Sequence, residues 1–229
     1  MPSPVSFTYE DRVSKIVMDD GKANIMSLGF LDALHETFDK AEAKEGLVLF
    51  SSGGKHFSGG FDLNVLNNGS LEEKRAMLIS GAELALRILS FPYPVISVCK
   101  GNAFPMGAFL LLASDVRFAA DGDYKITMNE VMIGLTVPYF AIEIARQRLT
   151  PAYFNRAVML GEMYGPKEAA KAGFVDTVLP PDMIDKTVSA TLQGLAAIDF
   201  TAHAATKARA RKSVIDAMRV AIDTEFVGH

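Results

Sequence analysis

Three short stretches of this sequence combine residue types that could bind an anion or move a proton. The first covers residues 53–62 and contains four glycines together with Lys55 and Ser58. Glycines this dense let backbone N–H groups point outward from a tight turn, which suits a group that develops negative charge. The stretch does not match a P-loop, because Lys55 is not followed by Ser or Thr. A plain strand-to-helix turn has the same composition, so both interpretations stay open for this loop alone.

The second stretch, residues 101–109, places Pro105 and Gly107 at the start of an apolar helix. The first backbone N–H groups of a helix have no partner within it and lie at the positive end of its dipole. They can hold an oxyanion, and one such donor stabilises a transition state by about 3 kcal/mol. An ordinary helix start has the same sequence features, so both interpretations stay open here too.

The third stretch centres on Glu130, which follows Asn129 and precedes three apolar residues. A carboxyl group in a partly desolvated place has a raised pKa and can act as a base near neutral pH. On its own, a glutamate after Asn at a helix entrance is more simply interpreted as a charge that the helix dipole favours.

The elements that must position these stretches are predicted from hydrophobic periodicity and helix caps. Ser27 can cap a helix that runs to Gly46, and Ser70 with Glu73 forms a capping box that opens a long helix. Strands are expected at residues 5–9, 13–18, 47–50, 95–98, 116–119, 124–127 and 174–179, with an apolar helix at 107–113 and mostly helices from 139 onward. Strands that alternate with helices and are followed by a run of helices indicate an α/β fold with a helical C-terminal part.

Composition limits the class of protein. The chain has 229 residues, 49% of them hydrophobic, which is enough for a sizeable core. The net charge of −4 does not favour nucleic-acid binding. The longest apolar run, residues 103–113, is too short to span a membrane and no signal segment is evident, so a cytoplasmic location is expected. A local basic stretch is interpreted as a solvated helix face rather than as a contact for an anionic cofactor: Lys207, Arg209, Arg211 and Lys212.

Other reactive residue types fit structural roles better. Cys99, the one cysteine, ends an apolar strand and is expected to be a buried, inert thiol. The histidines show no nucleophile–base spacing, and Ser58 does not lie in a Gly-x-Ser-x-Gly elbow. No cluster of His, Asp or Glu has the spacing of metal ligands, so no metal is expected. Asp62 and Asp115 are expected to anchor turns.

Taken together, the three stretches resemble the crotonase superfamily, also known as the enoyl-CoA hydratase/isomerase family. Residues 57–63, Phe-Ser-Gly-Gly-Phe-Asp-Leu, are similar to the first oxyanion loop of the family. Residues 101–115 resemble its second loop and the helix that follows. Residues 160–178, with Gly-Phe-Val-Asp at 173–176, resemble a further segment that recurs in the family. The resemblance runs from about residue 5 to about residue 210.

This resemblance implies a spiral of repeated ββα units over residues 1–195, a short helical region over residues 196–229, and a homotrimer or hexamer. It implies an acyl-CoA thioester as substrate, with CoA as part of the substrate and no separate cofactor. The thioester oxygen would lie between the backbone N–H groups of Phe61 and Met106. Further substrate contacts would come from Lys22, Ala23, Asn24, Ser58, Gly60, Asp62, Leu63, Gly107 and Phe109.

The reaction implied by the resemblance depends on the number of glutamates. Hydratases of the family look to use two, and Phe109 occupies the position of the first. The single Glu130 looks more like the Δ3,Δ2-enoyl-CoA isomerases of fatty-acid metabolism, in which one glutamate moves the proton and Phe109 would keep water out. Two alternatives stay open: hydration of a 2-enoyl-CoA to a 3-hydroxyacyl-CoA, and a catalytically silent member that only binds acyl-CoA. The chain after Lys207 is shorter than the helical tail that the family leads us to expect.

Overall fold

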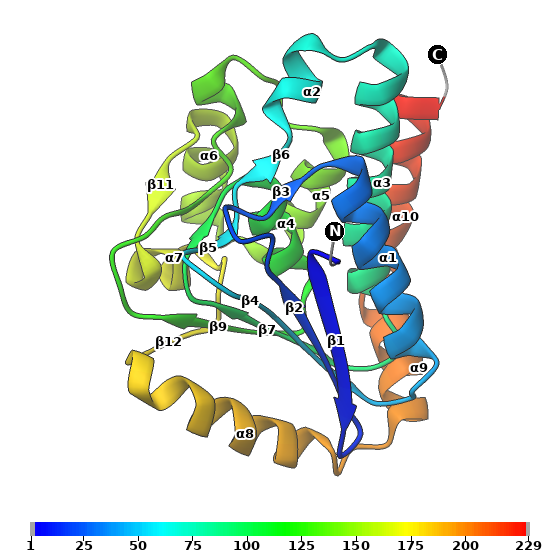
Figure 1. Cartoon of the computed structure of the whole chain (residues 1–229). Coiled ribbons are helices and arrows are strands. Elements are labelled where there is room, and N and C mark those ends of the chain that lie inside the picture. The colour runs from blue at the N-terminus through cyan, green and yellow to red at the C-terminus, as the bar shows by residue number, and fades with distance from the viewer. Residues whose placement is uncertain (1–2, 228–229) are drawn as a thin grey trace.

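Residues 3–227 are described in the computed structural model of this chain, and their strands form three sheets (Figure 1). The strands are β1 Val5–Glu10, β2 Val13–Met18, β3 Ile25–Met26, β4 Leu47–Ser52, β5 His56–Ser58, β6 Gly60–Phe61, β7 Val95–Cys99, β8 Asn102–Ala103, β9 Val116–Ala120, β10 Ile126–Thr127, β11 Met163–Tyr164 and β12 Thr177–Leu179. The helices are α1 Leu28–Glu42, α2 Leu63–Asn68, α3 Leu71–Ser90, α4 Pro105–Ala113, α5 Tyr139–Arg148, α6 Pro151–Leu160, α7 Pro166–Ala172, α8 Ile184–Leu195, α9 Phe200–Ala210 and α10 Lys212–Ile222. The described chain also contains 3₁₀ turns at Glu130–Ile133 and Pro181–Met183 and a π-helical turn at Asp223–Val227.

The strands wind as a spiral that alternates between one large sheet and two smaller ones. The large sheet has the order β1-β2-β4-β7-β9-β12, with β1 and β2 antiparallel and every later pair parallel. The smaller sheets have the orders β11-β10-β8-β5 and β3-β6. In chain order, a large-sheet strand, a small-sheet strand and a helix recur as β2-β3-α1, β4-β5-β6-α2 and β7-β8-α4. The expected α/β fold, a spiral of ββα units, is confirmed.

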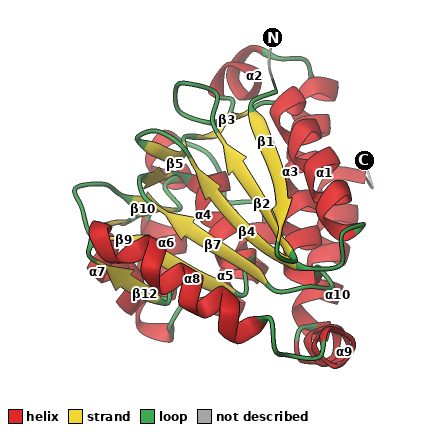
Figure 2. Cartoon of the chain, turned by 60° about the horizontal axis from the view of Figure 1, so that its bottom comes forward, coloured by secondary structure: helices red, strands yellow, loops and turns green. Residues whose placement is uncertain are grey.

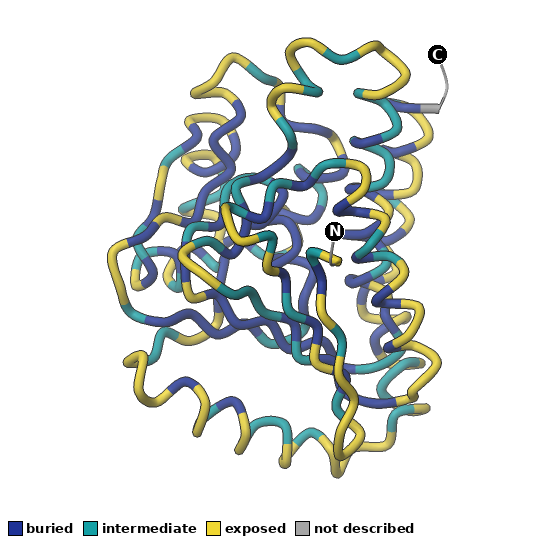
Figure 3. The backbone as a smooth tube through the Cα atoms, viewed as in Figure 1, coloured by how far each residue is buried: buried dark blue, intermediate teal, exposed yellow. Residues whose placement is uncertain are grey.

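Helices cover both faces of the large sheet. On one face lies α8, whose Ile184 and Val188 join Ile96 and Phe118 in an apolar cluster (Figure 2). On the other face α1, α3 and α4 contribute to the main core. Every residue of α4 after Pro105 is buried, and the dark centre of Figure 3 shows how completely the core encloses this segment. A helix that is apolar on all sides is stable only in such surroundings.

The predicted helix starts are confirmed, whereas two strands are shorter than expected. The Ser27 side chain accepts the N–H of Phe30, and Ser70 and Glu73 form the reciprocal capping box. The strand expected at 124–127 is reduced to β10, and the backbone N–H of Lys125 donates to the Asn102 side chain at 2.9 Å instead of to a strand. The strand expected at 174–179 is reduced to β12, because the Phe174 N–H still donates to the Ala169 carbonyl oxygen of α7 at 2.9 Å. Local caps are thus readable from sequence, while the ends of these two strands depend on contacts that it does not show.

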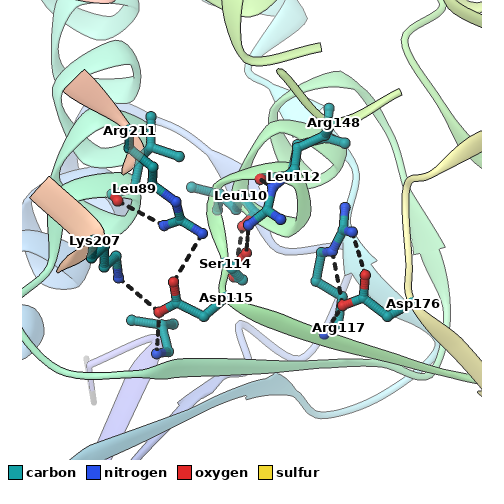
Figure 4. Close-up of polar contacts among 11 residues, drawn as sticks. Leu89, Leu110, Leu112, Ser114, Asp115, Arg117, Arg148, Asp176, Lys207 and Arg211 are labelled. Carbon is teal, nitrogen blue, oxygen red and sulfur yellow. Dashed lines mark hydrogen bonds and ion pairs between the residues drawn. The ribbon is translucent and has the colours of Figure 1, made fainter. Parts of the chain in front are cut away.

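A buried ion cluster joins the C-terminal helices to the end of α4 (Figure 4). Asp115 contacts the Lys207 ammonium at 2.7 Å and the Arg211 guanidinium at 2.9 Å, and it accepts the Val95 N–H at 2.7 Å. The expected role of Asp115 as an anchor is confirmed. Lys207 and Arg211 are 7% and 8% exposed, so the interpretation as a solvated face is wrong for these two, although the other two basic residues of the stretch are exposed.

The Gly-Phe-Val-Asp segment at residues 173–176 also supports the fold. Asp176 pairs with the Arg117 guanidinium and accepts the Arg117 backbone N–H at 2.7 Å (Figure 4). Gly173 ends α7 with a φ of 101°, and a Cβ there would lie 2.5 Å from the Arg148 carbonyl oxygen. This motif therefore joins α7 to β9 and lies outside the chemistry.

The C-terminal helices pack against the spiral. The predicted boundary after residue 195 falls between α8 and α9. Val214, Met218 and Ile222 of α10 belong to the main core, and α10 contacts α3 and α5. Over residues 3–227, no helix is both long enough and apolar enough to cross a membrane.

Replacing Asp115 with alanine is expected to lower the free energy of unfolding by about 3–5 kcal/mol, because Lys207 and Arg211 would remain buried without a counter-ion. Urea denaturation measures this loss. The matched control is Asp185→Ala, which removes an exposed pair with Lys100 and is expected to change the stability little. Equal losses in the two variants would contradict a structural role for the buried cluster.

Candidate active site

The glycine-rich loop runs from β5 to β6 and is held by the Ser58 side chain. The Ser58 hydroxyl donates to the Asn24 carbonyl oxygen at 2.8 Å and accepts the Gly60 N–H at 3.1 Å. Gly60 has a φ of 89°, a conformation that residues with a Cβ rarely adopt. The loop is therefore a preformed turn in which Ser58 is buried and Phe61 follows in a fixed position.

The start of α4 lies directly against this loop. Strand β8 runs parallel to β5, and the Phe104 N–H donates to the Ser58 carbonyl oxygen at 2.9 Å. A Cβ on Gly107 would lie 2.9 Å from the Cβ of Ser58, so only glycine allows this approach without a shift. Pro105, which has no N–H, and Met106 are the first two residues of α4, and the Met106 N–H has no partner within the helix. The two segments that carry Phe61 and Met106 are thus held side by side.

Gly81 of α3 makes room for both of these residues. A Cβ at this position would lie 2.5 Å from the Phe61 ring and 3.3 Å from the Met106 sulfur. Gly81 is not recognisable from the sequence, because a glycine within a helix gives no indication of the residues that pack against it. Its distant contacts could be found only from the folded chain.

Glu130 begins the 3₁₀ turn and is buried, with 6% of its surface exposed. Neither carboxylate oxygen has a hydrogen-bond partner among residues 3–227. Loss of solvation raises the pKa of Glu130 to about 7, and the nearby backbone N–H of the same residue counters this only in part. The simpler interpretation of Glu130, as a solvated charge at a helix entrance, does not fit this environment. A group that titrates near neutral pH can both take and return a proton.

Glu130 and the glycine loop line one cavity of about 400 Å³. Gly60, Phe61 and Pro105 form one side of it, and Leu63 and Leu66 of α2 form an apolar wall. Glu225 and Phe226, from the C-terminal π-helical turn, also line the cavity, and the sequence analysis predicted neither. The cavity thus joins a basic carboxylate, an N–H-bearing turn and space for an apolar chain.

Two of the residues predicted to contact the substrate, Ala23 and Asn24, hold the loop in place. Asn24 is buried, and its side-chain amide donates to the carbonyl oxygens of His56 and Phe57 at 3.1 Å and 3.3 Å. The Ala23 carbonyl oxygen accepts the Gly59 N–H at 2.7 Å. These contacts fix the shape of the glycine loop.

The remaining predicted residues differ in their access to the cavity. Asp62 caps α2 by accepting the Asn64 N–H at 2.9 Å, which confirms its role as an anchor, and Lys22 is exposed. Leu63 lines the cavity. Phe109 is fully buried with its ring 5.6 Å from that of Phe140, and it is not among the described residues that line the cavity.

The family model for enoyl-CoA hydratase/isomerase matches residues 8–226. The chain belongs to this family. It is 29% identical over 194 residues to human mitochondrial enoyl-CoA delta isomerase 1, a match that covers 83% of this chain but only 64% of the length of that relative. It is 31% identical over 179 residues to a probable enoyl-CoA hydratase of Bacillus subtilis (strain 168), covering 75% of this chain and 67% of the other.

A solved structure of a probable enoyl-CoA hydratase from Mycobacterium tuberculosis has the same fold. It superposes with a TM-score of 0.92 at 40% identity, covering 96% of this chain and 93% of that one. The relatives of this family member include isomerases and hydratases, so membership of the family does not by itself fix the reaction.

Cys99 does not line the cavity. Cys99 is buried as expected, and burial raises the pKa of its thiol to about 12, so little reactive thiolate forms near neutral pH. Among residues 3–227, no group of three or more His, Cys, Asp or Glu side chains could hold a metal ion. Within the cavity of this family member, Glu130 is therefore the buried candidate for acid/base chemistry.

Replacing Glu130 with glutamine is expected to stabilise the protein at about pH 8. The folded state holds the Glu130 proton more tightly than the unfolded state, where the pKa is near 4.5, so this group's contribution to stability is complete below that pH and is lost as the pH rises through about 7. At about pH 8 the variant should gain up to about 3 kcal/mol in free energy of unfolding.

Urea denaturation of both proteins across this pH range measures the difference, which should shrink as the pH falls toward 4.5. The control is Glu36→Gln on the exposed face of α1, for which no such pH-dependent gain is expected. A gain from the Glu130 variant that did not change with pH would contradict a raised pKa as its cause.

Proposed function

We propose that this family member isomerises a 3-enoyl-CoA to a 2-enoyl-CoA with Glu130 as the single acid/base. The observation that carries this proposal is the buried Glu130 carboxyl group, which has no hydrogen-bond partner in the described chain and a pKa raised to about 7. It lies in the same cavity as the segment that would present the Phe61 N–H. The isomerase name of the human relative gives the proposal further support.

The reaction begins when the thioester oxygen accepts hydrogen bonds from the N–H groups of Phe61 and Met106. Glu130 removes a proton from the alpha carbon, and the electron pair of the broken C–H bond enters a conjugated dienolate. The two N–H groups stabilise the negative charge that develops on the oxygen. Glu130 then gives the same proton to the gamma carbon, and the double bond moves to the alpha and beta carbons. The carboxylate is regenerated and no water is consumed.

Phe109 supports isomerisation because it supplies no second acid/base group. Its ring stands at the position where the family resemblance implies a glutamate in hydratases. The ring packs against Phe140 inside the core. Under this proposal, Phe109 matters because it places no carboxylate at this position. It does not line the cavity, so it does not shield the cavity from water.

Purified protein is expected to isomerise a 3-enoyl-CoA and to hydrate a 2-enoyl-CoA far more slowly, as measured in paired spectrophotometric assays. Glu130→Gln should lower kcat for isomerisation by about 100- to 10,000-fold, because the amide cannot carry the proton. Glu36→Gln serves as the control and should keep the full rate. Hydration at a comparable rate would overturn the single-glutamate mechanism. Tight acyl-CoA binding without either reaction would favour a silent binding protein.

Replacing Gly81 with alanine is expected to lower kcat by about 10- to 100-fold, because the new Cβ displaces the Phe61 ring and crowds Met106. The control is Gly194→Ala in α8, where a Cβ would meet nothing within 4 Å. Steady-state kinetics, with circular dichroism to verify folding, measure the effect. An unchanged kcat in the Gly81 variant would show that the reaction does not depend on the present positions of Phe61 and Met106.

Assembly as a homotrimer or hexamer stays a prediction, and one surface supports it. Exposed apolar side chains gather where the 3₁₀ turn meets the end of α6, among them Met132, Met159 and Leu160. A Cβ on Gly161 would lie 2.7 Å from the Met132 side chain, which places these two segments in contact. Exposed apolar patches of this kind often mark protein–protein interfaces.

A further inference from the structure

The C-terminal π-helical turn closes one side of the candidate active-site cavity. Helix α10 runs along α3 (Figure 1), and the turn Asp223–Val227 that follows it brings Glu225 and Phe226 to the cavity. Phe226 is buried and belongs to the main core, so it anchors this turn against the spiral. Glu225, the residue before it, is only half-buried. An acidic side chain is thereby placed in a mainly apolar cavity.

The Glu225 carboxylate has a defined orientation. One of its oxygens accepts the backbone N–H of Tyr139 at 2.8 Å. Tyr139 is the first residue of α5, so this contact also places the negative charge at the positive end of the helix dipole. A carboxylate can accept about four hydrogen bonds, and the contact with Tyr139 accounts for one of them.

The surroundings of Glu225 do not suit an entirely hydrocarbon ligand. The cavity wall also contains Leu66, Leu78, Ile133 and Leu135. Burial raises the pKa of Glu225, while the hydrogen bond from Tyr139 lowers it, so the carboxyl group already loses some hydration in the free protein. An alkyl chain that filled the cavity would remove more of this water and return no hydrogen bond. A chain with a hydroxyl group would replace the lost water.

We propose that Glu225 selects acyl groups that carry a hydrogen-bond donor, such as a hydroxyl group, on the part of the chain that enters the cavity. The inference deepens the proposed function, because it takes an acyl-CoA as the ligand, but it does not depend on isomerisation. Sites that bind a polar substrate group reject analogues that lack it, because their own polar groups are then left unpaired. Glu225 thus acts as a specificity residue, while Glu130 performs the chemistry.

The test measures binding of saturated acyl-CoA esters, which cannot be isomerised, by calorimetry. Plain esters are compared with hydroxyl-bearing esters of the same length, and the position of the hydroxyl group is varied along the chain. The wild-type protein is expected to bind at least one hydroxylated ester about tenfold more tightly than the plain ester. If the wild-type protein bound no hydroxylated ester more tightly than the plain ester, the proposal would be overturned. This result needs no variant.

Two substitutions separate recognition from helix capping. Glu225→Leu should abolish the preference and tighten binding of the plain ester. Glu225→Gln should keep part of the preference, because its amide oxygen can still accept a hydrogen bond. Glu143→Gln, on the same helix as Tyr139, is the matched control and should bind like wild type. A preference that survived in a folded Glu225→Leu variant would show that another group recognises the hydroxyl.

The outcomes distinguish this inference from the proposed function. Hydroxyl preference in a protein that fails to isomerise would uphold the role of Glu225 and overturn the isomerase proposal. Isomerisation without any hydroxyl preference would do the reverse. Hydration by the wild-type protein that was lost in Glu225→Gln would overturn the specificity role, because Glu225 would then be a second acid/base group.

Discussion

One backbone hydrogen bond, from the Phe104 N–H to the Ser58 carbonyl oxygen, joins the two segments on which the candidate site depends. The parallel pairing of β5 with β8 sets their direction, and the missing side chain of Gly107 sets how closely they approach. The positions of Phe61 and Met106 therefore follow from the spiral itself. Under the proposed function, N–H groups that are fixed before a ligand arrives need no reorganisation during the reaction, which is the condition for strong electrostatic stabilisation of an oxyanion.

The same packing that fixes Phe61 and Met106 removes water from Glu130. Helix α4 is apolar throughout and fills the centre of the core, so the cavity beside it has few polar groups to solvate a carboxylate. The other buried charged side chains among residues 3–227 are paired, as Lys207 and Arg211 are with Asp115. The unpaired Glu130 is the exception within this part of the chain, and such exceptions tend to occur at functional sites.

How much could be predicted from sequence depended on how local the signal was. The capping box at Ser70 and the two N–H-bearing turns were readable, because their signals lie within a few neighbouring residues. Burial of Lys207 was missed, since its partner lies 92 positions away in the chain. Gly81 and Glu225 were missed for the same reason. Gly81 packs against the Phe61 ring and Glu225 contacts the N-terminus of α5, and sequence periodicity connects neither pair.

The closing of the cavity by Glu225 and Phe226 has a consequence for biosynthesis. During translation the loops of the site leave the ribosome long before the turn Asp223–Val227 does. Until that turn docks, the side of the cavity that Glu225 and Phe226 close is open, and its other lining residues include Leu66 and Leu78. Exposed apolar surface of this kind attracts chaperones and other nascent chains. Docking of the turn Asp223–Val227 therefore also covers apolar surface that would make the growing chain prone to misassembly.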